Sequence, residues 1–304
     1  MLREHIIEPN FLIEIAKTRR NCVDFKNEFT KPSPRVVGFY PKLKNFKRLV
    51  LTGQNVDVSD IEKARLLELL NIIKSCGFQR IDQFDGQQSF TENLINLDIA
   101  PITHTCLLKN INEPITIKAK ILTIEDFERG VERITSQVLV PKSSIKIAET
   151  LTEIVRLSSN ITIVDPYFST QKGVWDTFLL ILEKSILHSP VSVKHITVMF
   201  DGSKKTAMSC RFLADSLRNL NLPFLDINTR IDFKDMRENG NEAIHNRYVI
   251  TELAGVSLPY GLQATNEQEQ DEFSLLNENI YSTRYQQYVE CKAVDIFECA
   301  SLRQ

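Results

Sequence analysis

Apolar residues at helical spacing mark the first three helices expected in the chain. The first is expected over Pro9–Arg20, where apolar positions recur every three or four residues. The second is expected from Ile61 to Cys76, because Ser59 and Glu62 form a capping-box signature before it. Its predicted buried positions are Leu66, Leu67, Leu69, Leu70 and Ile73. The third is expected over Ile145–Leu157, with Ile145 among its core-facing residues.

Shorter apolar runs fill the rest of the first half of the chain. Residues 35–40 are typical of an extended segment, and short apolar runs alternate with polar turns between residues 77 and 128. These runs predict strands and loops of a small α/β domain over residues 1–140. The pattern does not fix their order in a sheet.

From residue 145 onward, strand and helix patterns alternate regularly. Apolar β-type runs are followed by amphipathic segments, which favours a layered α/β sheet with functional residues at strand ends. The chain therefore divides into domains 1–140 and 145–304. The strands expected in the second domain are 160–165, 193–200, 224–232, 244–251 and 256–262, and its further helices are 174–187 and 204–220.

Composition and charge exclude several classes of protein. Of 304 residues, 42% are hydrophobic and 25% charged, which is the usual balance of a folded globular protein. The net charge of −2 gives no global attraction to a polyanion, so such a site must be a local patch. We expect a cytoplasmic protein without integral membrane segments. The six cysteines form no CxxC pair, and we expect neither a metal nor a cofactor.

The chemistry-bearing stretch of the chain is His245-Asn246-Arg247 followed by Glu252. In an extended strand, His245 and Arg247 point to the same face. A neutral imidazole can act as nucleophile or general base, and a guanidinium can grip phosphate oxygens bidentately. The pair therefore favours chemistry on a phosphodiester.

This spacing resembles the signature of the phospholipase D superfamily, in which His-x-Lys is followed by four residues and Asp. Over residues 145–304 the chain is most similar to the phospholipase D-like carboxy-terminal domain of MIT-domain proteins and its bacterial relatives. The motifs that carry the resemblance are His245–Arg247, Gly261-Leu262, Phe273-Ser274-Leu275, Arg284 and Val294-Asp295-Ile296-Phe297. It implies a layered mixed sheet with helices on both faces.

The motif departs from the superfamily pattern at two positions, where Arg247 and Glu252 replace Lys and Asp. The Gly-Ser-x-Asn that normally follows is absent. The family uses two such motifs and this chain has one, so activity requires a homodimer that brings two His245 side chains together.

Further candidates for substrate binding are Asp165, Tyr167, Asn266 and Arg284. Asp165 and Tyr167 follow a predicted strand, where Asp-Pro is also an ordinary exit from a strand. Arg247 could equally pair with Glu252, Asp165 or Asp201. Two basic segments, Lys204-Lys205 and the cluster Lys42, Lys44, Lys47 and Arg48, are anion-binding candidates that also suit a solvated surface.

Two functions follow from these features. The first is a phosphodiesterase, specifically a nuclease that resembles effectors of bacterial anti-phage defence, with nucleic acid as substrate and a partner protein of the defence system. The second is a catalytically degenerate module that binds nucleic acid, phospholipid head groups or a protein. Fold resemblance alone does not choose between them.

Overall fold

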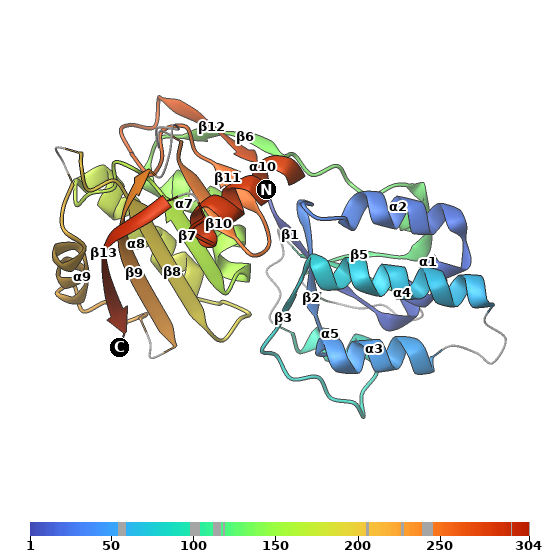
Figure 1. The fold of residues 1–304 in the computed structure, drawn as a ribbon. Coiled ribbons are helices and arrows are strands. Elements are labelled where there is room, and N and C mark those ends of the chain that lie inside the picture. The colour runs from blue at the N-terminus through green and yellow to red at the C-terminus, as the bar shows by residue number, and fades with distance from the viewer. Residues whose placement is uncertain are drawn as a thin grey trace. The chain divides into compact units, whose positions relative to one another are not determined.

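The computed structural model describes residues 1–53, 59–97, 104–111, 117, 119–204, 207–225, 228–238, 246–292 and 294–303. The chain forms two compact units, Leu2–Ile134 and Thr135–Gln304. Both combine helices with a β-sheet (Figure 1). The protein is therefore of the mixed α/β class.

The amino-terminal unit is built on a five-stranded sheet in which every pair of neighbouring strands is parallel. The strand order is β3-β2-β1-β4-β5. The elements in chain order are β1 (Arg3–Ile7), α1 (Pro9–Lys17), α2 (Arg19–Phe29), β2 (Arg35–Phe39), α3 (Leu43–Thr52), α4 (Asp60–Ser75), β3 (Gly77–Gln79), α5 (Phe90–Ile95), β4 (His104–Leu107), β5 (Lys120–Leu122) and α6 (Ile124–Arg129).

Capping residues set the helix boundaries in this unit. The predicted box at Ser59 and Glu62 is present at the start of α4. The single helix expected over 9–20 is instead two, because Thr18 is extended and its side chain accepts a hydrogen bond from the Asn21 amide, which starts α2. Leu67, predicted to be buried, is 53% exposed on the outer face of α4, so that prediction was wrong.

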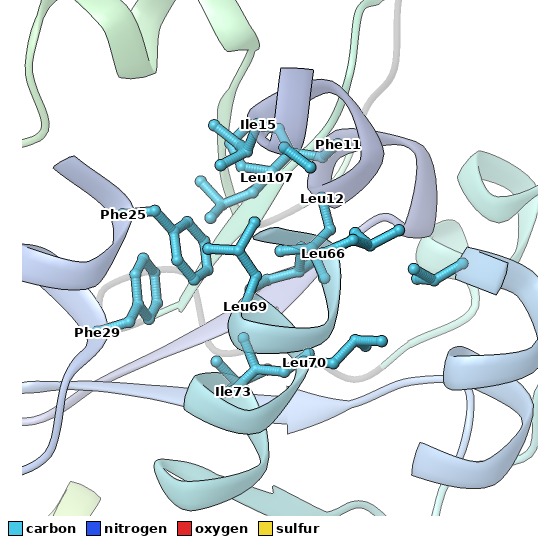
Figure 2. Packing of buried hydrophobic residues seen from close by; sticks show 14 of the residues in the cluster. Phe11, Leu12, Ile15, Phe25, Phe29, Leu66, Leu69, Leu70, Ile73 and Leu107 are labelled. Carbon is cyan, nitrogen blue, oxygen red and sulfur yellow. The ribbon is translucent and has the colours of Figure 1, made fainter. Parts of the chain in front are cut away.

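The core of the amino-terminal unit lies between the sheet and helices α1, α2 and α4 (Figure 2). Phe25 and Phe29 of α2 stack with ring centroids 4.4 Å apart. The residues labelled in Figure 2 are Phe11, Leu12, Ile15, Phe25, Phe29, Leu66, Leu69, Leu70, Ile73 and Leu107. Complete burial of such side chains contributes about 1.5–3 kcal/mol each, so this cluster fixes how the helices lie on the sheet.

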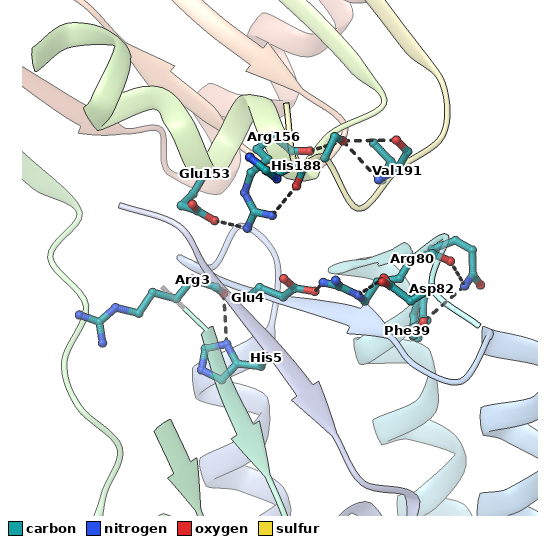
Figure 3. Close-up of polar contacts among 12 residues, drawn as sticks. Arg3, Glu4, His5, Phe39, Arg80, Asp82, Glu153, Arg156, His188 and Val191 are labelled. Carbon is teal, nitrogen blue, oxygen red and sulfur yellow. Dashed lines mark hydrogen bonds and ion pairs between the residues drawn. The ribbon is translucent and has the colours of Figure 1, made fainter. Parts of the chain in front are cut away.

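Buried charge also organises the amino-terminal sheet. Arg80 is 3% exposed and donates from Nη1 to Glu4 Oε1 at 2.5 Å and from Nε to Asp82 at 2.7 Å (Figure 3). His5 Nδ1 lies 3.1 Å from the Arg3 carbonyl, and its Nε2 lies 3.2 Å from Arg35 Nη1. Because Arg35 can only donate, Nδ1 carries the proton and the ring is neutral. Burial, followed by the charge of Arg35, lowers the pKa of His5 to about 3.

The carboxy-terminal unit contains an eight-stranded mixed sheet of order β13-β9-β8-β7-β10-β11-β12-β6. Strands β7, β8 and β9 are mutually parallel, and the remaining pairs are antiparallel. Its elements are β6 (Gln137–Pro141), α7 (Ser144–Leu157), β7 (Asn160–Val164), α8 (Lys172–Ile186), β8 (Lys194–Phe200), α9 (Cys210–Arg218), β9 (Thr229–Glu238), β10 (Tyr248–Thr251), β11 (Gly255–Ser257), β12 (Gln270–Leu275), α10 (Glu278–Arg284), the π-helical turn η1 (Tyr285–Val289) and β13 (Val294–Arg303).

Helices cover both faces of this sheet. On one face, Phe178 of α8 packs against Phe233 of β9 with centroids 6.0 Å apart. On the other, Tyr281 and Tyr288 of α10 and η1 belong to a buried cluster with Met199 of β8. Each strand therefore sends alternate side chains into two different hydrophobic layers.

Several predicted boundaries in this unit shift. Helix α9 begins at Cys210 rather than at 204, because the Ser209 side chain caps it through the Phe212 amide. Strand β9 extends to Glu238, beyond the predicted end at 232. Ile145, predicted to face the core, is 56% exposed, so that expectation was wrong.

A buried lysine caps the C-terminus of α7. Lys194 is 3% exposed, and its Nζ donates to the carbonyls of Val155, Arg156 and Ser158 (2.9, 2.8 and 2.5 Å). Arg156 itself donates to Glu153 and to the His188 carbonyl (Figure 3). Burial lowers the pKa of Lys194 to about 7, whereas three carbonyl acceptors at a helix C-terminus favour its charged form.

Candidate functional site

Three parallel strands of the carboxy-terminal unit bring charged side chains to one edge of the sheet. Strand β7 ends just before Asp165 and β8 just before Asp201. Strand β9 carries Asp235 and Arg237 near its carboxyl end. Strand β10 runs antiparallel to β7, and Tyr248 pairs with Val164. Arg247, one residue before β10, therefore reaches the same edge.

Arg247 is held by a buried carboxylate. Its Nε donates to Asp165 Oδ1 at 3.3 Å, and its Nη1 donates to the Pro259 carbonyl at 2.6 Å. Asp165 is 3% exposed and also accepts from the Tyr167 and Leu262 amides at 3.0 and 3.3 Å. Burial raises the pKa of Asp165, against the lowering effect of the Arg247 charge. Of the three partners weighed from the sequence, Asp165 is the one with which Arg247 pairs.

A glycine makes room for this ion pair. Gly261 has φ +65°, and a Cβ at this position would overlap Asp165 Oδ2 and Arg247 Cδ. Any other residue would thus meet both backbone strain and a steric clash. The turn carrying Gly261 is part of the architecture that positions Arg247.

Tyr167 presents a partly exposed aromatic ring close to two cations. Its side chain is 40% exposed, with the Arg247 guanidinium 4.9 Å and the Lys204 ammonium 5.3 Å from the ring centroid. These distances are within the range of cation–π attraction. Proteins that hold single-stranded nucleic acid combine positive charge with exposed aromatic rings, through phosphate contacts and base stacking.

The neighbouring strand ends form a second charged group. Asp201 accepts from Lys204 at 3.2 Å and from Arg237 Nη1 at 3.3 Å, while Arg237 also contacts Asp235. Partial burial opposes ionisation of Asp201, yet hydrogen bonds from Ser203 and Lys204 lower its pKa. The edge of the sheet thus holds cations whose positions are fixed by carboxylates.

Glu252 lies at the opposite end of β10 from Arg247. Its carboxylate accepts from the backbone amides of Ser159 and Asn160 at 2.6 and 3.0 Å, at the beginning of β7. A strand rises about 3.3 Å per residue, so Glu252 is separated from Arg247 by roughly 15 Å of strand. Glu252 therefore stabilises the backbone at the start of β7 and lies away from the charged edge.

The other candidates fall in different places. His245 lies outside the described residues. Asn266 forms a turn, because its Oδ1 accepts from the Gln268 and Glu269 amides. Arg284 lies on α10, where it stacks over Tyr248 at 5.6 Å and donates to Gln287. The structure thus unites Arg247, Asp165 and Tyr167, and it gives Asn266 and Arg284 other partners.

Sequence reasoning did not select Arg237 and Asp235 of this edge. The expected strand ended at 232, before either residue, and the apolar residues that follow, Phe233 and Met236, are three positions apart and so do not continue an alternating pattern. A longer strand would have placed both at the carboxyl edge. Within the described ranges, no three His, Cys, Asp or Glu side chains are grouped so as to hold a metal ion.

Every helix in the described part of the chain falls short of the length and apolar character that a bilayer crossing requires. No protein-family model matches the sequence, and no curated protein matches it. Among solved structures, the chain has some similarity to TrmBL2, an archaeal chromatin protein whose structure shows a novel mode of DNA binding. The TM-score is 0.28 at 6% sequence identity, over 55% of this chain and 56% of that one. The chain thus spans just over half of that protein's length, and a likeness of this degree carries no argument.

Proposed function

We propose that the carboxy-terminal unit is a phospholipase D-like phosphodiesterase whose substrate is a nucleic acid. The observation that carries the proposal is the grouping of Arg247 with Tyr167 and Lys204 at the carboxyl edge of β7 and β8. A guanidinium and an ammonium close to an exposed ring match a sugar–phosphate backbone with its bases. A phospholipid head group offers no base to stack on Tyr167.

The proposed mechanism assigns one role to each group. His245 attacks phosphorus and forms a phosphohistidine while the ester oxygen leaves with a proton from a second imidazole, and water then hydrolyses the intermediate. Arg247 offsets the charge that develops on the non-bridging oxygens. Asp165 acts as a positioning residue, because its buried carboxylate fixes the guanidinium. The second imidazole comes from His245 of another copy, since the chain carries one motif.

A cleavage assay of the purified full chain on single- and double-stranded DNA and RNA, with and without EDTA, tests the proposal. We expect cleavage that His245→Ala abolishes and that Arg247→Lys reduces roughly 10- to 100-fold, because an ammonium lacks the planar fork with which a guanidinium contacts a phosphate bidentately. Arg211→Ala, an exposed arginine of α9, is the matched control and should leave the rate unchanged.

A second function, binding without cleavage, is favoured by one specific observation. Arg247 already donates to Asp165 and Pro259, and Glu252 accepts from two backbone amides, so both described motif residues stabilise the fold. Fluorescence anisotropy with labelled single-stranded DNA and RNA separates the two functions. Binding that Tyr167→Ala weakens, together with no cleavage under any condition, would establish a nucleic-acid-binding module; neither binding nor cleavage would contradict both the nuclease and the binding of nucleic acid.

A further inference from the structure

The amino-terminal unit contains a cavity at the place where parallel α/β sheets bind ligands. In its strand order, β3-β2-β1-β4-β5, strands β2 and β3 lie on one side of β1 and strands β4 and β5 on the other, so the topology switches direction at β1. In open parallel sheets, ligands bind outside the carboxyl ends of the strands near such a reversal. A cavity of about 450 Å³ lies beside it, lined by residues that follow β1, β2 and β3. This volume is in the lower part of the range for small-molecule sites, which is roughly 300–1,000 Å³.

One wall of the cavity is a face of α3. Asn45, Arg48, Leu49 and Thr52 line it and are spaced as one side of a helix, while Phe46 and Val50 face the core. Arg48 is exposed, and no acidic side chain of the described residues pairs with it. The basic cluster noted in the sequence therefore contributes one guanidinium to the cavity, available for an anion.

The facing wall is aromatic. Phe84 and Phe90 are half-buried and line the cavity, and their ring centroids are 6.1 Å apart. The loop that carries Phe84 is held in place by Asn93, which is 2% exposed, donates to the Asp85 and Ser89 carbonyls and accepts from the Asp85 amide. A loop fixed by buried hydrogen bonds presents a preformed surface, which lowers the entropic cost of binding a flat ring.

A carboxylate lies at the end of β1, where the sheet meets the cavity. Glu8 lines it, and its Oε2 accepts from the Lys109 amide at 2.7 Å while its Oε1 accepts from Asn10 at 3.3 Å. Carboxylate oxygens retain further acceptor capacity. Glu8 is thus oriented to accept hydrogen bonds from the hydroxyl groups of a sugar.

We infer that this cavity binds a mononucleotide, with the base against Phe84 and Phe90, the phosphate on Arg48 and the ribose hydroxyls on Glu8. The turn from β1 to α1 reads Glu8-Pro9-Asn10 and lacks the glycines that let a diphosphate approach the backbone. A single phosphate on a side-chain cation is therefore the fit, rather than a dinucleotide. This site is separate from the nucleic-acid site proposed for the other unit.

Isothermal titration calorimetry of the full chain with AMP, GMP, CMP and UMP tests the inference. We expect at least one of them to bind, and Arg48→Gln to weaken its binding roughly 10- to 100-fold, the usual effect of losing a charged hydrogen bond to phosphate. Phe84→Leu should weaken the mononucleotide and its free nucleoside alike. Lys44→Gln, on the same helix but outside the cavity lining, is the control and should change nothing.

Three results would overturn the inference. One is the absence of binding by all four mononucleotides at millimolar concentration. Another is binding that Arg48→Gln leaves intact but Tyr167→Ala abolishes, which would locate the nucleotide in the carboxy-terminal unit. Titration with inorganic phosphate and with adenosine separates the two halves of the ligand, and binding of phosphate alone at Arg48 without any effect of the base would also contradict the inference.

Discussion

Replacing Arg247 by alanine should destabilise the carboxy-terminal unit in a pH-dependent way. The substitution removes the only cation that the described structure pairs with Asp165, together with a donor to the Pro259 carbonyl. Breaking a fully buried ion pair costs about 3–5 kcal/mol. Because the Arg247 side chain is 21% exposed and Asp165 keeps two amide donors, we expect a loss of about 2–3 kcal/mol at pH 7.

The loss should shrink as the pH falls. Without Arg247, burial raises the pKa of Asp165 further above its unfolded value, so the folded variant binds a proton that the unfolded chain does not. Stability of the variant then decreases as pH rises, and near pH 4 the loss should be only about 1 kcal/mol. In a double-mutant cycle, adding Asp165→Asn should recover part of the loss at pH 7.

Urea unfolding followed by tryptophan fluorescence measures this effect in the correct unit. The single tryptophan, Trp175 on α8, packs against Phe168 and Phe178 at 6.1 and 5.5 Å. A destabilisation below about 0.5 kcal/mol at pH 7, or one that does not vary between pH 4 and 7, would refute the view that Arg247 neutralises a buried carboxylate.

Three further predictions concern positions described above. His5→Gln should flatten the pH dependence of the stability of the amino-terminal unit. In the wild type the pKa of His5 is about 3, so the unfolded chain binds a proton that the folded state does not, and the free energy of unfolding falls by about 2 kcal/mol between pH 7 and 5. Amide exchange in β1 measures this change. Gly261→Ala should cost about 2–3 kcal/mol through its positive φ and the overlap with Asp165; an unchanged midpoint in urea would contradict this. Lys194→Met should cost about 2–4 kcal/mol by removing a charged donor from three carbonyls, of which that of Arg156 also accepts from the Ser189 hydroxyl; calorimetry showing no fall in Tm would count against that role.

Local signals in the sequence predicted much of the fold. The start of α4 was predictable because Ser59 and Glu62 are three residues apart and satisfy each other's backbone. The runs that became β7 and β8 were predictable because strands buried on both sides are almost wholly apolar. Leu67 and Ile145 were assigned to the core because apolar character alone does not tell which side of a helix a flanking position takes.

Long-range contacts explain what the sequence left open. Asp165 and Arg247 are 82 residues apart, and β7 and β10 pair through a strand order that no local pattern encodes. Arg237 was missed because the end of β9 is set by pairing with β13 rather than by its own residues. The contact of Glu252 with the Ser159 and Asn160 amides at the start of β7 depends on the same pairing, so its position away from the charged edge was not foreseeable.

The four residues between Arg247 and Glu252 are the whole of strand β10. Glu252 accepts hydrogen bonds from the amides at the start of β7, and Arg247 pairs with Asp165, the residue that follows the end of β7. The spacing between Arg247 and Glu252 therefore matches the length of the neighbouring strand. Inserting or deleting one residue would turn Arg247 to the other face of the sheet. A spacing of this kind is maintained by strand pairing whether or not the edge performs chemistry, so the spacing by itself is a signature of the fold, and the identity of the residues at its ends is what reports on function.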